Sequence, residues 1–287
     1  MKLTPIICAA ALVVGVGSAS NAWTPDMVSP YSATWDFSNG LQGWTISGNG
    51  SWVDPGTDPL GPGLPDGAPS GGGAGNLYLP DGSRATLDVS ALNIGWGAGL
   101  NGFQLIADIY VPNLRPLTGF TFGYPGNMVH NAGLGVARSD GREVYINGHI
   151  DRGRMRYRDR TWDNTDRGPN WVMEGEAGLP DQFWWDQWIT VAFDYDFSSP
   201  GKANAAIYVP WDSAVSTAGW ITLATDIDLH PSADQHFTKL ILGQLGGGSW
   251  TQAQFDNVRL TVVPEPGSIV ALGAGLIGMA GMIRRKR

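Results

Sequence analysis

Short runs of alternating apolar and polar residues, or of β-branched residues, recur along most of the chain, separated by Gly, Pro, Asn and Asp. This period of two is typical of β-strands, and no window of about 15 residues between the two ends has the apolar stripe and caps of a helix. We therefore expect an all-β fold, an antiparallel β-sandwich. An Asp-Gly pair at 140–141 predicts a hairpin turn. Strands are expected at residues 33–37, 41–46, 51–53, 76–79, 84–89, 103–111, 119–124, 133–138, 143–146, 189–196, 205–209, 221–223, 236–242 and 254–263.

The two strongest runs also predict which side chains face the interior. Residues 103–111 are almost continuously apolar, which predicts a central strand covered on both faces. Residues 189–196 alternate, so the apolar Val191, Phe193 and Tyr195 are expected on one face. The polar Thr190 and Asp194 are expected on the opposite face.

The two ends of the chain carry longer apolar runs. Ile6–Gly17 follows Lys2 and precedes a small-x-small site at 20–22, which predicts a helical signal peptide over 1–22, cleaved after Ala22. Gly267–Ile283 is an apolar run of 17 residues followed by four cations, Arg284, Arg285, Lys286 and Arg287. This run predicts a C-terminal transmembrane helix of marginal length, and the cations predict that its end is cytoplasmic. We divide the chain into 1–22, a sandwich domain at 23–263 and a tail at 264–287.

Charge and cysteine content limit the function of the central domain. Without Lys2, the four tail cations and Glu265, the 18 basic and 26 acidic residues become 13 and 25, a net charge of −12. Such acidity argues against nucleic acid as a partner. The single cysteine, Cys8, lies in the signal peptide, so the exported part has no disulfide and depends on its core for stability.

Two segments offer oxygen ligands on a turning backbone, the arrangement that calcium prefers. Residues 54–75 are rich in Gly and Pro and contain Asp54, Asp58 and Asp66; we interpret them as an exposed loop, with a calcium loop as the alternative. Trp162–Gly168 is the second candidate metal loop, through Asp163, Asn164 and Asp166. Neither has a complete ligand set, and no other cofactor is expected.

Arginine stands at every second position of one stretch, at Arg152, Arg154, Arg156, Arg158 and Arg160. In a strand these side chains would share one face, and guanidinium groups fit carboxylates, sulfates and phosphates. One interpretation is a contact with an anionic glycan. The interpretation we favour is a solvated edge strand whose charges prevent edge-to-edge aggregation.

Tryptophan is abundant, with 13 in the chain, all after the signal peptide. A flat indole ring can stack on a sugar, but it is also good core material. Trp35, Trp44 and Trp188 lie in alternating runs and are expected in the core. Others lie near turn-rich segments and are candidates for exposure, including Trp211, Trp220 and Trp250. From this group we select as candidate glycan-binding residues Trp162, Trp171, Trp184 and Trp185.

Catalytic motifs are absent from the sequence. There is no Gly-x-Ser-x-Gly, no cysteine nucleophile in the exported part, no complete P-loop and no zinc spacing among the four histidines. Only Glu143, Glu174 and Glu176 lie inside the domain as glutamates. These absences disfavour catalysis, although a glycosidase that uses aspartates stays open.

The C-terminal segment resembles the PEP-CTERM sorting signal of exported proteins in Gram-negative bacteria. The likeness rests on Pro264, Glu265 and Pro266 after Val263, on the following Gly/Ala/Leu/Ile run and on the four final cations. The resemblance implies that a membrane exosortase recognises this motif and processes the tail. It also implies an inner-membrane intermediate, then a place at the cell surface or in the extracellular matrix of organisms that make extracellular polysaccharide.

Three stretches of the body resemble parts of carbohydrate-related jelly rolls. Residues 35–44 are similar to their opening strands, residues 188–209 to the late hairpin of laminin-G or concanavalin-A-like domains, and Phe255–Val258 to their final strand. The leading hypothesis is an exported, non-catalytic surface or matrix protein that binds polysaccharide. The alternatives are a glycan hydrolase or lyase of the same class, and a purely structural surface protein whose tryptophans all lie in the core.

Overall fold

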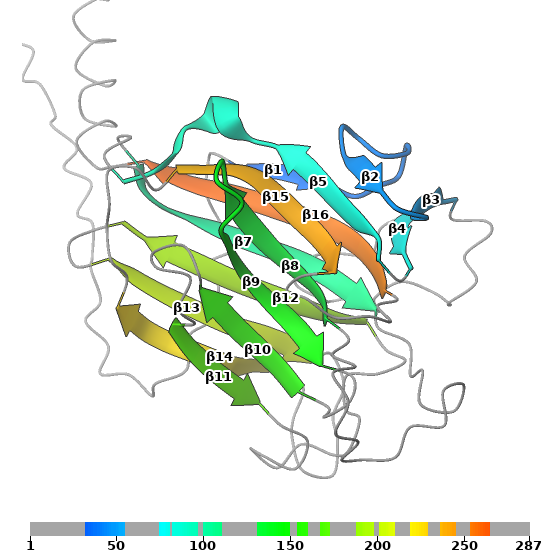
Figure 1. Cartoon of the computed structure of the whole chain (residues 1–287). Coiled ribbons are helices and arrows are strands. Elements are labelled where there is room, and N and C mark those ends of the chain that lie inside the picture. Colours follow the sequence, from blue (N-terminus) through cyan, green and yellow to red (C-terminus); the bar gives the residue numbers. More distant parts are fainter. Residues whose placement is uncertain are drawn as a thin grey trace, which may run out of the picture.

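The computed structural model describes residues 32–54, 75–80, 82–96, 100–110, 131–149, 154–159, 167–172, 188–197, 201–209, 219–228, 236–244 and 253–264. Within these residues the strands form two eight-stranded sheets, all of whose pairings are antiparallel. The sheets pack face to face (Figure 1). The prediction of an all-β antiparallel sandwich is confirmed.

The first sheet has the order β14-β13-β12-β7-β16-β4-β3, with β1 also paired to β16. Its long strands run from the β14 edge to β16, and its short strands β4 and β3 lie at the other end. The bounds are β1 Ser32–Trp35, β3 Ser51–Val53, β4 Asn76–Leu79, β7 Leu100–Tyr110, β12 Trp188–Asp196, β13 Lys202–Val209, β14 Gly219–Asp228 and β16 Ala253–Pro264.

The second sheet has the order β11-β10-β9-β8-β15-β5-β2, with β6 also paired to β15. A single turn of 3-10 helix, η2 (Ser90–Leu92), connects β5 to β6. The bounds are β2 Thr45–Ser47, β5 Arg84–Asp88, β6 Ile94–Gly95, β8 Asn131–Arg138, β9 Glu143–His149, β10 Arg154–Asp159, β11 Arg167–Val172 and β15 His236–Gln244.

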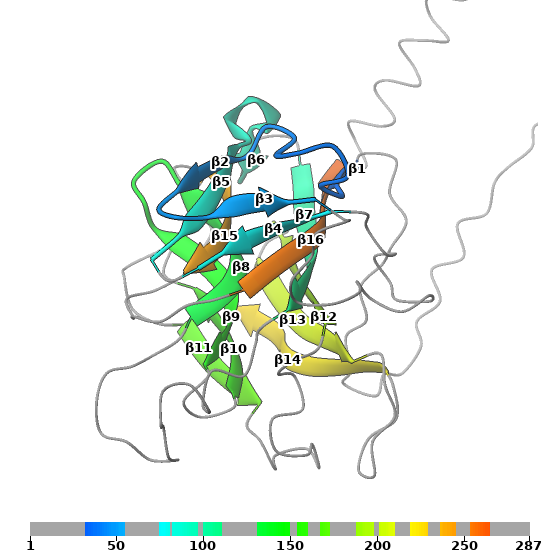
Figure 2. The same cartoon turned by 90° about the vertical axis from the view of Figure 1, so that its right-hand side faces the viewer.

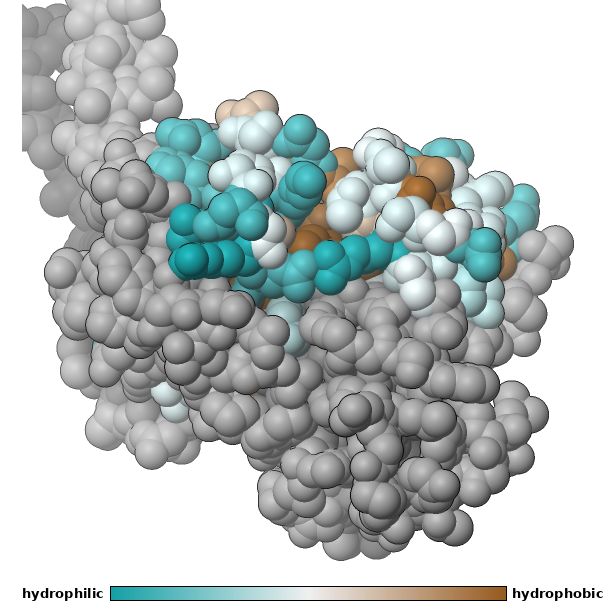
Figure 3. Space-filling view, in the orientation of Figure 1, coloured by the Kyte–Doolittle hydropathy of each residue, from teal (hydrophilic) through white to brown (hydrophobic). Residues whose placement is uncertain are grey.

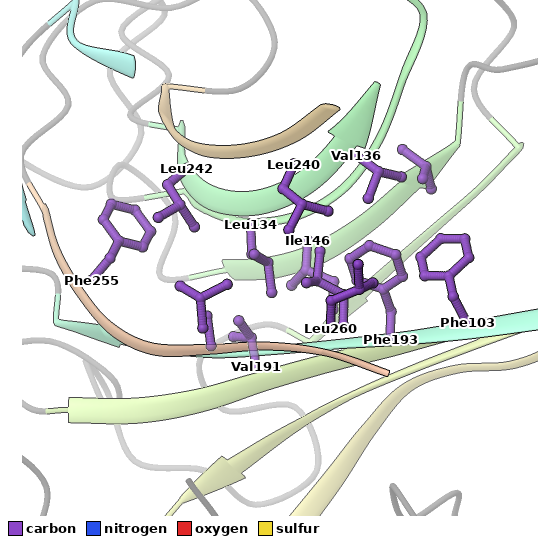
Figure 4. Packing of buried hydrophobic residues seen from close by; sticks show 14 of the residues in the cluster. Phe103, Leu134, Val136, Ile146, Val191, Phe193, Leu240, Leu242, Phe255 and Leu260 are labelled. Carbon is purple, nitrogen blue, oxygen red and sulfur yellow. The ribbon is translucent and has the colours of Figure 1, made fainter. Parts of the chain in front are cut away.

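The hydrophobic core fills the space between the two sheets. Figure 4 shows Phe103, Val191 and Leu260 of the first sheet pointing toward Leu134 and Leu240 of the second. All five are at most 1% exposed. Burial of this kind stabilises by about 1.5–3 kcal/mol for each large apolar side chain. A fold without disulfides therefore has a core large enough to hold it together.

The alternation of the central strands is confirmed side chain by side chain. β7 is buried along most of its length and lies between β12 and β16, as its apolar run predicts. In β12, Val191, Phe193 and Tyr195 belong to the core cluster, whereas Thr190 and Asp194 do not. The two sets lie on opposite faces because successive residues of a strand point to opposite sides.

The opening motif at residues 35–44 is a structural turn. Phe37 and Trp44 are 0% and 3% exposed and belong to the core. Asp36 Oδ1 accepts hydrogen bonds from Gln42 Nε2 at 2.7 Å and Ser38 Oγ at 2.8 Å, which lower the pKa of Asp36. Trp52 Nε1 donates to the Phe37 carbonyl at 2.7 Å. The polar residues of this motif thus hold the turn together.

The structure corrects the prediction for the arginine-rich strand. Arg154, Arg156 and Arg158 lie in β10, which pairs with β9 on one side and β11 on the other, so it is not the edge strand. The edge is β11, a strand that the sequence pattern does not predict. Pro169 lies in β11, and an edge strand tolerates proline because one side of its backbone needs no partner.

Several expected features lie outside the described residues. They are the signal peptide at 1–22, the strand at 119–124, most of the loop at 54–75 and the tail beyond Pro264. Within the described part of the chain, no helix has the length and hydropathy needed to cross a membrane. The predicted signal and transmembrane helices and the domain boundaries stay predictions.

Candidate functional site

The first sheet has a second face, turned away from the core, that carries mostly polar side chains. Its residues alternate with the core residues of β7, β12, β13 and β16. They include the polar Gln104, Asp108, Thr190, Gln254 and Asp256, which are at most 7% exposed. Buried polar side chains are uncommon unless they have a structural or functional use. We call this surface the polar face.

A buried hydrogen-bond network occupies one row of the polar face. Asp108 and Asp256 lie directly opposite each other on β7 and β16. Asp108 accepts hydrogen bonds from Thr190 Oγ1 at 2.8 Å and from Asn257 Nδ2 at 2.9 Å. The Asn257 backbone N–H donates to Asp256 Oδ1 at 2.7 Å. Both carboxylates are thus engaged inside the sheet, which indicates a structural role for this row.

Asn257 makes this network possible through its backbone conformation. Its φ is +47°, and the register of β16 against β7 shifts between Asp256 and Arg259. Asparagine tolerates this left-handed conformation, which is typical of a β-bulge. The extra residue lets both Phe255 and Val258 face the core.

The half-buried part of the polar face lies on β12, β13 and β14, and we call it the β12–β14 strip. Its members alternate with core residues of the same strands and retain partial exposure to solvent. They are Asp194, Asp196, Lys202, Asn204, Tyr208, Trp220 and Thr222.

One end of the strip is aromatic. Tyr208 and Trp220 are directly opposite on β13 and β14, with ring centroids 5.3 Å apart and planes at 63°. The rings meet edge to face, which is a favourable arrangement for an aromatic pair. Trp188 lies on the same sheet face with its ring 5.7 Å from that of Tyr110, but it is only 6% exposed. Trp188 is buried as predicted, although it lies outside the cluster between the sheets.

The other end of the strip is acidic. Asp194 lies opposite Asn204, whose side chain and backbone both make hydrogen bonds with its carboxyl group. Burial, with a smaller contribution from the nearby charge of Asp196, raises the pKa of Asp194 to about 7. Hydrogen bonds from Asn204 oppose this shift. Asp194 is therefore close to half-protonated at neutral pH, whereas an ordinary aspartate is ionised.

The strip has hydrogen-bonding capacity that the described part of the protein does not use. Asp194 Oδ1 and Thr222 Oγ1 are buried atoms without a hydrogen-bond partner there, as is Trp188 Nε1 on the same face. Such atoms are rare in folded proteins and usually mark a strained, wet or functional location. Atoms of this kind also occur elsewhere in the described residues, for example Trp44 Nε1 in the core and Tyr145 Oη in the second sheet, so they do not by themselves mark the strip as a binding surface.

Arg259 adds a cation to the polar face beside the buried network. Partial burial lowers the pKa of its guanidinium, and the negative charge of Asp108 opposes this effect. Three or more His, Cys, Asp or Glu side chains that could hold a metal ion do not come together anywhere in the described ranges. The candidate metal loop with Asp163, Asn164 and Asp166 lies outside them.

The structure brings two of the sequence-predicted glycan candidates together. Arg156 of β10 lies directly opposite Trp171 of β11, and Arg154 and Arg158 flank it in β10. Figures 1 and 2 show these strands at the same end of the sandwich as β14, which contacts both. The remaining candidates, Arg152, Arg160, Trp162, Trp184 and Trp185, lie outside the described residues.

The outer side of the second sheet differs from the polar face because it carries a small buried apolar cluster of Ala137, Tyr145 and Ile241. In Figure 3 the described surface of the side that faces the viewer is mainly hydrophilic, with apolar side chains gathered at a few points. Arg84 and Glu143 of this sheet form an ion pair at 2.7 Å. A partly exposed pair of this kind contributes little, and it does not indicate a ligand site.

Comparison with solved structures finds similar folds at low sequence identity. The binding domain of botulinum neurotoxin serotype G matches with a TM-score of 0.44 and 11% identity over 83% of this chain and 49% of that chain. The chain thus spans about half the length of that neurotoxin chain. Arcelin-5, a lectin-like defence protein from Phaseolus vulgaris, matches with a TM-score of 0.43 and 9% identity over 82% of this chain and 100% of that chain. Cellulose induced protein Cip1 matches with a TM-score of 0.41 and 10% identity over 80% of this chain and 96% of that chain.

No curated protein matches the sequence. The C-terminal segment does match a known family: residues 262–286 match the PEP-CTERM protein-sorting motif. This motif indicates export and sorting to the cell surface through an inner-membrane step, with exosortase as the processing partner. The chain therefore carries a PEP-CTERM sorting motif at the end of a β-sandwich.

Proposed function

We propose that this exported protein is a non-catalytic surface or matrix component of jelly-roll topology that binds polysaccharide through the β12–β14 strip. The observation that carries the proposal is the half-buried Tyr208–Trp220 pair on the same sheet face as Asp194 and Asn204. Aromatic rings stack on the C–H face of a sugar, while carboxyl and amide groups bind its hydroxyls. The strip supplies both kinds of group on adjacent strands.

Binding to an immobilised polysaccharide tests the proposal. We expect the exported protein to be retarded in gels that contain extracellular polysaccharide from the producing cells. Trp220→Ala and Tyr208→Ala should each weaken this retardation by about tenfold, as expected for a lost stacking residue. Tyr78→Ala is the matched control, because Tyr78 is a half-buried tyrosine of β4 in the same sheet, four strands from β13. Equal retardation of all four proteins would refute the role of the strip.

The arginine-rich strand offers a second contact for anionic polymers. Support comes from the pairing of Arg156 with Trp171 at one end of the sandwich. Replacing Arg154, Arg156 and Arg158 with Gln should weaken binding to a sulfated polymer and leave a neutral polymer unaffected, because guanidinium groups pair with anions. If both polymers bind as before, this strand is a structural element of the second sheet.

A glycan hydrolase is the second candidate function, and the Asp194–Asp196 pair favours it. The two residues are separated by one position on one face of β12, so their Cα atoms are about 6.8 Å apart. A hydrolase needs two carboxyl groups at about 5–10 Å, one of them protonated near neutral pH. The raised pKa of Asp194 fits the acid of such a pair. Release of reducing ends by the exported protein, abolished in Asp194→Asn, would establish this function over simple binding.

A purely structural protein would bury its tryptophans in the core. Among the described residues, Trp44 and Trp96 belong to the core and Trp35 and Trp52 pack against it, whereas Trp220 is half-buried on the polar face. We therefore favour the binding function over the structural one.

A further inference from the structure

The sorting motif and the folded sandwich share residues. The matched motif begins at Val262, whereas β16 continues to Pro264. In the register of the first sheet, Val263 lies opposite Gly102 and Pro264 lies opposite Leu100 of β7. The first residue of the Pro-Glu-Pro sequence is thus part of a β-strand.

We propose that exosortase binds this protein only after residues 262–264 have left the first sheet, so that the end of β16 becomes part of the segment that the enzyme docks. An enzyme that reads an extended peptide needs access to its backbone and side chains. Backbone groups that are paired with β7 are not available for such contacts. Processing is therefore coupled to local opening of the sandwich.

The structure makes this opening easy. Proline has no backbone N–H, so Pro264 can contribute only its carbonyl group to the pairing. The register also becomes irregular between Val263 and Pro264. Val263 is 40% exposed and loses little contact when it leaves the sheet. Strand ends with these properties fray at little cost in free energy.

The part of β16 that can leave the sheet ends at Val262, two residues before Pro264. Thr261 is paired on both sides, with Gln104 of β7 and Ser32 of β1. Thr261 is 7% exposed and Leu260 is 1% exposed within the core. Val262 is half-buried and packs against the same core. Residues up to Thr261 therefore stay in the sandwich, and the boundary between buried strand and readable motif lies at Val262.

The test is to move the motif out of the sheet without changing it. Four Gly/Ser residues are inserted between Thr261 and Val262 of the full chain, in cells that contain exosortase. Conversion of the precursor is followed by pulse-chase and intact mass. We expect conversion about two- to fivefold faster, because the cost of releasing a terminal strand segment is small. An insertion of eight residues should give the same gain, since the motif is already free after four.

The matched control is the same four-residue insertion at the exposed turn between Asp140 and Gly141. It should leave the conversion rate of the precursor unchanged. A Thr261–Val262 insertion that converts at the control rate, or more slowly, would overturn the proposal. Hydrogen exchange of the purified full chain gives a second test: the Val263 amide should exchange at least about 100-fold faster than that of Leu260. Equal protection of the two amides would also overturn it.

Discussion

Replacement of Asp194 by Asn should change how the stability of the protein depends on pH. The pKa of Asp194 is raised from 3.8 to about 7 in the folded state, chiefly by burial. Folding therefore favours the protonated carboxyl group. The resulting stabilisation is fully present below pH 3.8 and is lost as the pH rises through about 7. It is lost because, between these two pH values, Asp194 releases its proton in the unfolded chain but keeps it in the folded protein.

The size of the effect follows from the shift. A difference of about three pKa units at about 1.4 kcal/mol each is worth about 4 kcal/mol. Asp194 keeps some exposure to water, which screens its charge, so we expect about 2–4 kcal/mol. Asn is neutral at every pH and nearly isosteric. Asp194→Asn should thus match the wild type near pH 4 and exceed its free energy of unfolding by about 2–4 kcal/mol at pH 8.

Urea unfolding at pH values from 4 to 8 measures this difference. Asp196→Asn serves as the diagnostic variant, because the charge of Asp196 contributes to the raised pKa of Asp194. In the Asp196→Asn background the pKa of Asp194 should be lower, so the pH at which Asp194 loses its stabilising effect should also be lower. A difference between wild type and Asp194→Asn that stays constant within about 0.5 kcal/mol over the whole range would refute the reasoning. It would also remove the support for Asp194 as an acid.

Three further predictions concern other parts of the chain. Asn257→Ala should lower the free energy of unfolding by about 2–4 kcal/mol, because it removes a hydrogen-bond donor to buried Asp108 and strains the left-handed backbone. Urea unfolding measures this effect. The control is Asn93→Ala, at an exposed residue that is also left-handed, and it should lower the free energy of unfolding by only about 1–2 kcal/mol. Trp52→Phe should cost about 1 kcal/mol in the same assay through the lost bond to the Phe37 carbonyl, and no change would mean that water replaces it. Replacing Pro264, Glu265 and Pro266 together by Ala should leave an unprocessed, membrane-retained form, detected by intact mass; normal processing would contradict the sorting role of these residues.

The alternation of the sequence predicted the central architecture but not its edge. β7 and β12 were recognisable because their apolar positions repeat with a period of two, and tertiary packing uses that pattern directly. β11 was missed because Arg167, Pro169 and Asn170 resemble a loop. An edge strand needs pairing on one side only, so such residues are tolerated there. The position of β10 inside its sheet depended on finding β11.

The polar face was only partly predictable. The separation of Asp194 from Val191 and Phe193 follows from strand alternation, and the same parity places Trp188 on the polar face rather than in the core. The contact between Asp108 and Asn257 joins residues that are 149 positions apart. No local sequence pattern predicts such a contact, because it requires β7 and β16 to pair with each other in one particular register. The raised pKa of Asp194 likewise depends on burial and on pairing with Asn204, which exist only in the folded sheet.

The division of each central strand into two faces determines which experiments can reveal function. Substitutions on the β12–β14 strip leave the core cluster untouched, because the core residues of the same strands point to the opposite side of the sheet. Loss of binding in Trp220→Ala therefore reports on the ligand. The buried network around Asp108 differs from the strip, because its carboxylates are buried and hydrogen-bonded between strands. Removing one member there leaves an unsatisfied buried group at a cost of about 1–3 kcal/mol. Loss of binding after such a change would report on folding, so the strip is the part of the polar face on which the proposed function can be decided.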